Sequence, residues 1–307
     1  MFIKKLIKWC IPLGIYLKLK QGKKETAEKG LGYDDIPPLL TSEQIKELSG
    51  FCYDDIRLIS KFAGPNIAPL DGYYTDFTGI KTSPRALEAL KDRCGMVNRS
   101  LPFPNDTFHA SVVEYASLYY VVEKTINKSG GEASIFTMFE LGAGWGPWMA
   151  YTAKACKTLG FSQINIIGIE GEENKIPLIK EHLFVNGFRQ DNDELSQSYN
   201  NVYSRIIHGV VTDDDKNIEF PVVDTHDYGA SVVNTKFVRS QMKINIRGYS
   251  LKTLMNDFDV VDFLHIDIQG HEVDVIKSAV STLKQKVRYI CIGTQPQNRR
   301  RLNRNHV

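Results

Sequence analysis

The chain has 307 residues, enough for one large domain with a substantial core. Its 38 basic and 36 acidic residues leave a net charge of +2, a balance that indicates no nucleic-acid partner. The five cysteines are odd in number and include no CxxC pair, which argues against a disulfide framework or a zinc site and favours a reducing, cytoplasmic location.

Residues 1–24 are rich in lysine and apolar side chains. The longest uncharged run, from Trp9 to Leu17, is much shorter than the roughly 20 residues that span a bilayer. Lys8 interrupts the apolar run that a signal peptide would need, and no small-residue cleavage site follows. Three interpretations stay open: weak contact of residues 1–20 with the inner membrane surface, a frayed terminus, or a short helix that packs on the main domain.

Residues 1–130 predict a mainly helical segment, because no rhythm of alternating strands and helices runs through them. A capping box precedes a first helix that continues to about residue 63. Ser83 can cap a second helix that ends before Gly95, and residues 109–127 predict a third. We interpret this N-terminal segment as a cap over the substrate.

From residue 131 onward, short apolar runs alternate with helical segments. Such a rhythm indicates an α/β fold, an open parallel sheet with helices on both faces. A sheet of this kind binds its ligand beyond the carboxyl ends of its strands. The predicted strands are 135–141, 164–169, 202–207, 260–268 and 287–292, and the predicted helices are 147–159, 173–186, 250–257 and 272–283.

A glycine-rich turn follows the first strand, with Gly142, Gly144 and Gly146 in GxGxG spacing. Glycine allows positive φ and lets a ligand approach the backbone closely. A helix that begins near Pro147 would direct free N–H groups to the same place, which suits a carboxylate or a phosphate. Dinucleotide-binding loops have GxGxxG, and no GKS or GKT sequence of a P-loop is present. Because Glu140 stands two residues before the first glycine, the turn is similar to the first motif of class I methyltransferases.

Glu170 ends the second predicted strand, where a carboxylate can accept hydrogen bonds from both hydroxyls of a ribose. Proteins that bind NAD and proteins that bind S-adenosylmethionine both place an acid there, so this position predicts a ribose and leaves the cofactor open. After the third strand, Val210 is predicted to border an adenine ring, with an ordinary polar turn as the alternative.

The fourth strand and the turn after it carry a second set of candidates. Asp267 is at the carboxyl end of this central strand, and an ionised acid buried there needs partners, which indicates a function. His271 and Glu272 follow on the turn and have either a functional or a structural role. We expect His265 to pack within the sheet.

These sequences resemble the FkbM-type methyltransferases, a class I family that depends on S-adenosylmethionine. The family signature Lys-Ile-Asp-Val-Glu-Gly-x-Glu is similar to HIDIQGHE here, where Asp267, Gly270 and Glu272 match and His265 and Gln269 depart. The resemblance covers about residues 72–294. The other sequences that carry it are GAGWGPW, YTDFTGIKT, FPNDTFHASVVEYA and RGYSLKTLMNDF.

The resemblance implies a Rossmann-like class I sheet with strand order 3-2-1-4-5 and a cofactor-binding domain at residues 131–307. It also implies methylation of a hydroxyl oxygen, often on a sugar or a glycan precursor. The family continues well past the fifth strand, whereas only 13 residues follow Thr294 here. We therefore expect the C-terminal strands of the sheet to be missing, because the chain is truncated or frame-shifted or because its sheet is shortened.

Methyl transfer to a hydroxyl requires a general base, and Asp267 and His271 are the predicted catalytic residues, with His109 as a third candidate. No metal is assigned, although magnesium held by Asp267 and Glu272 is an alternative. Two other functions stay open: an NAD(P)-dependent oxidoreductase and a catalytically inactive cofactor-binding remnant. The predicted cofactor-binding residues are Glu140, Gly142, Gly144, Gly146, Glu170, Val210 and Asp267.

Overall fold

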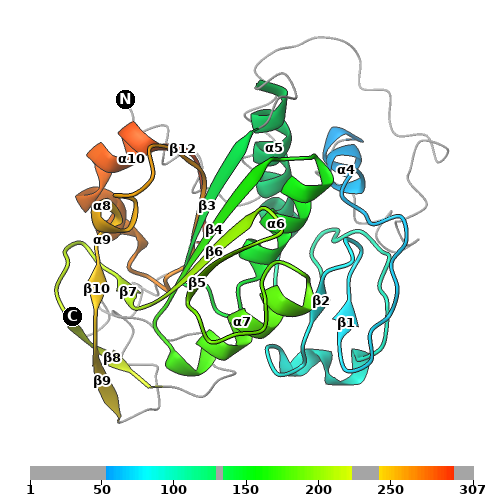
Figure 1. The fold of residues 1–307 in the computed structure, drawn as a ribbon, viewed down its shortest axis with the longest axis horizontal. Helices are drawn as coiled ribbons and strands as arrows, with labels where there is room; N and C mark the ends of the chain where they lie inside the picture. The colour runs from blue at the N-terminus through cyan, green and yellow to red at the C-terminus, as the bar shows by residue number, and fades with distance from the viewer. Residues whose placement is uncertain (1–52, 129–133, 223–241, 294–307) are drawn as a thin grey trace, which may run out of the picture.

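The computed structural model describes residues 53–128, 134–222 and 242–293. Its centre is one six-stranded sheet in the order β12-β11-β3-β4-β6-β5 (Figure 1). The strands in chain order are β3 (Ile135–Leu141), β4 (Gln163–Glu170), β5 (Ser196–Tyr199), β6 (Val202–His208), β11 (Val261–Ile266) and β12 (Val287–Ile292).

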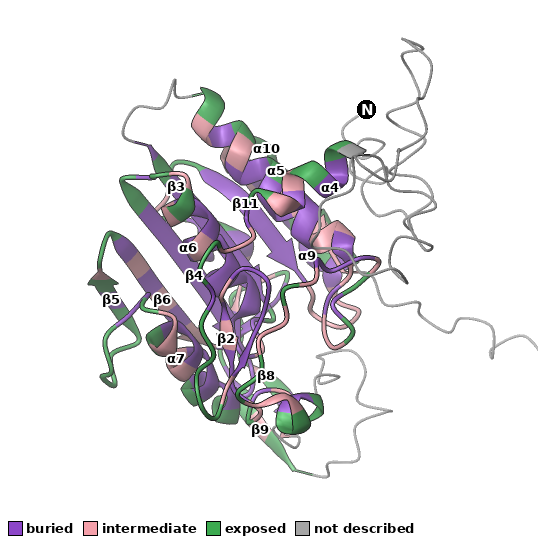
Figure 2. Ribbon diagram, turned by 90° about the vertical axis from the view of Figure 1, so that its right-hand side faces the viewer, coloured by how far each residue is buried: buried purple, intermediate pink, exposed green. Residues whose placement is uncertain are grey.

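Five of these strands run parallel, and their order confirms the predicted 3-2-1-4-5 arrangement of a Rossmann-like sheet. The central strands β3 and β4 are buried along all but their first residue, as Figure 2 shows, because helices cover both of their faces. The sixth strand, β5, pairs antiparallel with β6 and was not predicted. Its sequence, SQSY, buries only Gln197, so it lacks the apolar pattern of a strand.

Three helices pack on one face of the sheet and three on the other, giving three layers (Figure 1). The larger core cluster joins the first three helices to Phe136, Met138, Ile164 and Ile166, and the smaller one joins the other three to the opposite face. The helices of the first face are α5 (Val112–Lys128), α6 (Pro147–Thr158) and α7 (Ile176–Val185). Those of the second face are α8 (Leu251–Leu254), α9 (Glu272–Ser278) and α10 (Val280–Lys286).

The described part of the N-terminal segment lies beside α5, α6 and α7 (Figure 1). Its apolar side chains, including Ile56 and Phe77, belong to the same core cluster as the sheet. The division into domains at residue 130 stays a prediction, and the largest core cluster crosses it. Before α5, the elements of this segment are α4 (Tyr53–Ser60), β1 (Tyr74–Thr75), β2 (Lys81–Thr82) and the 3-10 helix η2 (Glu88–Arg93).

The three helices predicted in this segment have different outcomes. The helix predicted to end near residue 63 is α4 over its described part. The helix predicted between Ser83 and Gly95 is wrong as an α-helix: Ser83 closes only a short turn, Leu87 is extended, and the 3-10 helix η2 follows. The third is confirmed as α5, which begins at Val112 because a preceding loop is held in another conformation.

A small β arm extends from the carboxyl ends of β4 and β6 (Figure 1). Val210, Phe220 and Ile246 form a separate apolar cluster there. The arm consists of β7 (Val210–Val211) paired with β10 (Gly248–Tyr249), and of β8 (Ile218–Pro221) paired with β9 (Lys243–Ile246).

Within the described ranges, no helix is both long and apolar enough to cross a membrane. The predicted membrane contact of residues 1–20 and any strand after Gly293 lie outside the described residues.

Candidate functional site

The glycine turn between β3 and α6 is clamped by the strands on either side of it. The N–H groups of Gly142 and Ala143 both donate to the carbonyl oxygen of Ile169, at 3.0 and 2.9 Å. Gly142 has φ of 76°, and a Cβ placed there would lie 2.1 Å from the carbonyl oxygen of Asp267. Only glycine therefore fits where the turn passes the end of β11.

The start of α6 is closed by the buried side chain of Glu140. Its carboxylate accepts hydrogen bonds from the N–H groups of Met149 (2.9 Å) and Trp148 (3.3 Å), and Pro147 has no N–H to offer. The prediction that this helix presents free N–H groups is therefore wrong. Because Glu140 already occupies these donors, the helix end cannot bind a pyrophosphate in the way that dinucleotide loops do.

Burial raises the pKa of Glu140 well above its ordinary value. The two N–H donors oppose this shift, and the neighbouring carboxylates of Glu170 and Asp267 add to it. A cluster of three acids in one place disfavours anions and favours a ligand with positive charge.

Glu170 at the end of β4 is fixed by one backbone donor on each oxygen. The N–H of Gly144 donates to Oε2 at 2.6 Å, and the N–H of Glu172 donates to Oε1 at 2.8 Å. Each carboxylate oxygen has a second lone pair, so Glu170 keeps the capacity to accept two further hydrogen bonds. The turn thus orients the carboxylate before any ligand arrives.

A pocket of about 310 Å³ opens at the carboxyl ends of the strands, where a parallel sheet is expected to bind its ligand. Gly171 and Phe220, which lie against each other, line one part of it together with Lys175, and Phe108 and Trp148, which both flank the ring of His109, line another part. We call the first part the cofactor side and the second the acceptor side, after the roles that the proposed function gives them. Of the predicted cofactor-binding residues, those that line the pocket are Glu140, Gly142, Gly144, Glu170, Val210 and Asp267.

Gly146 is not part of the pocket lining. It has φ of 74° and caps α6, and a Cβ there would lie 3.0 Å from Ile179. Its place in the structure is the close packing of the turn against α7.

Asp267 follows β11 and lies beside the glycine turn. Its Oδ1 accepts a hydrogen bond from Nε2 of Gln269 at 2.9 Å. Burial raises the pKa of Asp267, the nearby carboxylates of Glu272 and Glu114 add to the rise, and His265 opposes it. The roles predicted for Asp267 in binding and in catalysis stay predictions.

His271 and Glu272 lie outside the pocket lining. Nδ1 of His271 is 3.9 Å from a carboxylate oxygen of Asp274. The buried Glu272 accepts hydrogen bonds from the N–H groups of Ile268 (3.2 Å) and Gly270 (3.0 Å), so it holds the turn after β11 in shape. No group of three or more His, Cys, Asp or Glu side chains in the described ranges is arranged to hold a metal ion.

The acceptor side contains His109, which the sequence named as a candidate base, and His265 and Glu114, which the sequence did not place there. His265 is buried in β11 as expected, but it also lines the pocket, with Nε2 3.6 Å from Oε1 of Glu114 on α5. Strand periodicity was the signal that could have found it, because His265 and Asp267 are two residues apart and share a face.

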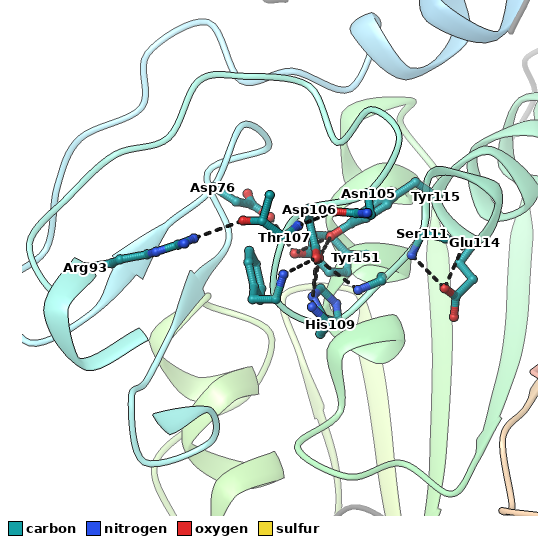
Figure 3. Close-up of polar contacts among 12 residues, drawn as sticks. Asp76, Arg93, Asn105, Asp106, Thr107, His109, Ser111, Glu114, Tyr115 and Tyr151 are labelled. Carbon is teal, nitrogen blue, oxygen red and sulfur yellow. Dashed lines mark hydrogen bonds and ion pairs between the residues drawn. The ribbon is translucent and has the colours of Figure 1, made fainter. Parts of the chain in front are cut away.

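His109, the third candidate for the general base, also lines this side of the pocket. It lies in the loop before α5 (Figure 3). Its Nδ1 pairs with the carboxylate of Asp106. The sequence names His109 as a candidate, but it contains no signal that brings the loop onto the pocket.

Residues 140–301 of the chain match the family model described as Methyltransferase FkbM domain. A protein of Jannaschia sp. (strain CCS1) that carries the name "Putative methyltransferase" is 25% identical over 232 residues, which are 73% of this chain and 76% of that protein. A solved structure, the methyltransferase FkbM from Methylobacillus flagellatus KT, aligns with 57% of this chain at 14% identity and a TM-score of 0.29. The aligned part is 42% of that chain, so the alignment spans less than half of its length.

Proposed function

The chain belongs to the methyltransferase FkbM family, and from this premise we propose that it transfers the methyl group of S-adenosylmethionine to a hydroxyl oxygen. When bound, S-adenosylmethionine supplies an electrophilic methyl carbon on a positively charged sulfur. The chain's own residues must therefore hold a cationic adenosine compound on one side of the pocket and a hydroxyl on the other.

One observation carries the choice of cofactor: carboxylates occupy the donors of the glycine turn. Glu140 takes the N–H groups at the start of α6, and Glu170 takes the N–H of Gly144. The pyrophosphate of NAD(P) would meet two carboxylates where it needs N–H donors. The sulfonium and ammonium groups of S-adenosylmethionine are cations, which the same carboxylates attract.

The residues of the cofactor side fit the other parts of this ligand. Glu170 has the acceptor capacity for both ribose hydroxyls. Val210 and Phe220 are buried apolar side chains of the β arm that line the pocket, and they would border the adenine ring.

For the acceptor we propose a sugar or a glycan precursor. The acceptor side combines the aromatic rings of Phe108, Trp145 and Trp148 with the polar groups of His109 and Glu114. Aromatic rings pack against the apolar faces of a sugar ring, and carboxylate and imidazole groups accept hydrogen bonds from its hydroxyls.

We also propose a cytoplasmic location, which the chemistry of the cysteines supports. Within the described ranges, Cys94, Cys156 and Cys291 are in no disulfide bond. Free thiols persist in a reducing compartment.

Calorimetry with S-adenosylhomocysteine and fluorescence titration with NADH test the cofactor. We expect S-adenosylhomocysteine to bind and NADH not to bind. Glu170→Gln should weaken the binding of S-adenosylhomocysteine by roughly 30- to 150-fold, since it loses charge-assisted hydrogen bonds worth about 2–3 kcal/mol. Glu173→Gln is the matched control, because Glu173 is exposed and outside the pocket lining. Binding of NADH in place of S-adenosylhomocysteine, or an unchanged affinity in Glu170→Gln, would overturn the proposal.

A further inference from the structure

The loop before α5 holds one carboxylate in an unusually complete set of hydrogen bonds (Figure 3). Oδ1 of Asp106 accepts the N–H groups of Phe108 (3.0 Å), His109 (2.8 Å) and Ala110 (3.0 Å). Oδ2 of Asp106 pairs with Nδ1 of His109 and accepts the hydroxyl of Tyr115 at 3.0 Å. The carboxylate cannot turn without breaking these bonds, so it fixes the imidazole ring as well.

A second layer of polar groups supports this pair from behind. The hydroxyl oxygen of Tyr115 is 3.2 Å from that of Tyr151, and Tyr151 donates to Oδ2 of the buried Asp76 at 2.5 Å. Burial raises the pKa of both tyrosines well above the ordinary value, so both stay protonated and donate.

The ionised form of Asp106 is strongly favoured in this setting. Burial by itself would raise its pKa, but the hydrogen bond and charge of His109 and the N–H groups of Ala110 and His109 outweigh burial and lower the pKa to about 2. When the imidazole of His109 is neutral, an ionised Asp106 favours the tautomer with the proton on Nδ1, and Nε2 is then the accepting nitrogen.

That second nitrogen is buried and has no hydrogen-bond partner among the described residues. Aromatic rings surround the imidazole, with centroids of Phe108, Trp145 and Tyr151 at 4.8, 5.3 and 6.1 Å. A buried polar atom without a partner is destabilising, so its presence at a pocket wall calls for a ligand that donates a hydrogen bond to it.

The other candidate bases are less well prepared. His271 is outside the pocket lining, and Asp267 lies beside the glycine turn on the side where the cofactor is proposed to bind. The ring nitrogens of His265 are also buried without a hydrogen-bond partner among the described residues, but Glu114 is 3.6 Å from Nε2 of His265, farther than Asp106 is from Nδ1 of His109.

We propose that His109 is the general base for the acceptor hydroxyl and that Asp106 is its positioning residue; this rests on the proposed function. The acceptor hydroxyl gives its proton to Nε2 of His109 while its oxygen bonds to the methyl carbon. The electron pair of the breaking carbon–sulfur bond stays on sulfur, which becomes a neutral thioether. His109 ends as an imidazolium that the carboxylate of Asp106 stabilises.

NMR of the histidine ring signals tests this without a known acceptor. Sinefungin, an S-adenosylmethionine analogue with a protonated amine in place of the methyl group, puts a cation where the methyl carbon would be. If His109 faces that place, sinefungin should lower its pKa by roughly half a unit or more relative to S-adenosylhomocysteine, because like charges oppose each other.

The titratable groups that interact electrostatically with His109 are Asp106, Glu114 and His182, and they are the same in both complexes. His271, outside the pocket, is the internal control and should titrate identically with both ligands. An identical pKa of His109 in the two complexes would overturn the assignment. If neither ligand binds, the proposed function and this inference both fail.

Two variants separate the base from the cofactor site. His109→Gln identifies the His109 signal and should bind S-adenosylhomocysteine within about twofold of the unchanged chain; a tenfold or greater loss would place His109 in the cofactor site instead. Asp106→Asn should lower the pKa of His109 by about one unit, since it removes the charge that stabilises the imidazolium. The sinefungin comparison uses the unchanged chain, so it decides the matter even if Asp106→Asn does not fold.

Discussion

The cofactor side and the acceptor side of the pocket differ in how far along the chain their contacts reach. On the cofactor side, Glu140 bonds to Met149 and Gly144 bonds to Glu170, so each contact closes within one strand–helix–strand unit. On the acceptor side, Glu114 of α5 approaches His265 of β11, and these two residues are far apart in the sequence. The first side is a product of local chain geometry, and the second exists only after the N-terminal segment has docked on the sheet.

This difference has a consequence for how each side responds to mutation. A change in the glycine turn acts on the backbone itself, where neighbouring strands leave no room. A change on the acceptor side acts on a network of side chains, whose members can be removed one at a time.

The largest effect is expected for Gly142→Ala. The new Cβ would lie 2.1 Å from the carbonyl oxygen of Asp267 at a residue with φ of 76°, so the turn and the end of β11 must separate. We expect a loss of about 4 kcal/mol or more in the free energy of unfolding, measured by urea denaturation.

Gly72→Ala is the matched control in the N-terminal segment. Gly72 has φ of 78°, nearly the same as Gly142, but a Cβ placed there would meet no atom within 4 Å. It should lose only the roughly 1–2 kcal/mol that a positive φ costs. If the two variants lost the same free energy of unfolding, the strands around the turn would have moved to accept the new Cβ. That result would contradict the clamped geometry of the turn.

The next effect is a pH dependence that arises from His182, whose Nδ1 is 3.2 Å from the carbonyl oxygen of Trp145 in the turn. Burial lowers its pKa from 6.5 to about 4. Between pH 6.5 and pH 4, His182 binds a proton in the unfolded chain but not in the folded chain. The contribution of His182 to the free energy of unfolding is therefore fully present above pH 6.5 and falls as the pH approaches 4. The loss is about 3 kcal/mol.

Urea denaturation across this pH range measures the effect, with His182→Gln as the comparison. The variant should lose less stability between pH 6.5 and 4 than the unchanged chain; parallel curves would contradict the assignment. The contribution of Asp106 on the acceptor side has a different window. Its pKa of about 2 is below the ordinary value, so its contribution is lost only as the pH falls from about 4 towards 2.

The smallest effect distinguishes two tyrosines one turn apart on α5. Tyr115→Phe removes a donor to Asp106 and should cost about 1–2 kcal/mol. Tyr119 is equally buried, but its hydroxyl has no hydrogen-bond partner in the described ranges, so Tyr119→Phe should change stability by less than about 0.5 kcal/mol. Thermal unfolding of both variants measures the difference, and similar shifts in the two would show that Tyr115 contributes nothing through Asp106.

The same contrast explains what could be predicted from the sequence. The strand order, the glycine turn and the pocket positions of Glu170 and Asp267 follow from a repeated strand–helix pattern, whose contacts are local. The sequence did not predict that Glu140 closes the start of α6. The motif indicates that Glu140 lies near the glycine turn, but it does not indicate that its carboxylate accepts the N–H groups of the helix.

The acceptor side could not be predicted for a different reason. Asp106 and His109 are in an irregular loop, and their conformation depends on Tyr115 and Tyr151 from two helices. His265 was expected only to pack, since periodicity gives the face of a strand but not which loop or helix approaches it. Contacts between segments that are far apart in the sequence produce no pattern that can be recognised in a single sequence.

The carboxylate that closes α6 also bears on competition inside a cell. ATP, ADP and NAD all share an adenosine with the proposed cofactor, and each carries phosphates on the ribose carbon that would face the glycine turn. Glu140 occupies the N–H donors at that point, so we expect these nucleotides to be rejected because their phosphates find no free donors there, even though their adenosine fits. The buried side chain of Glu140 would then prevent ATP, ADP and NAD from inhibiting the protein in the cell.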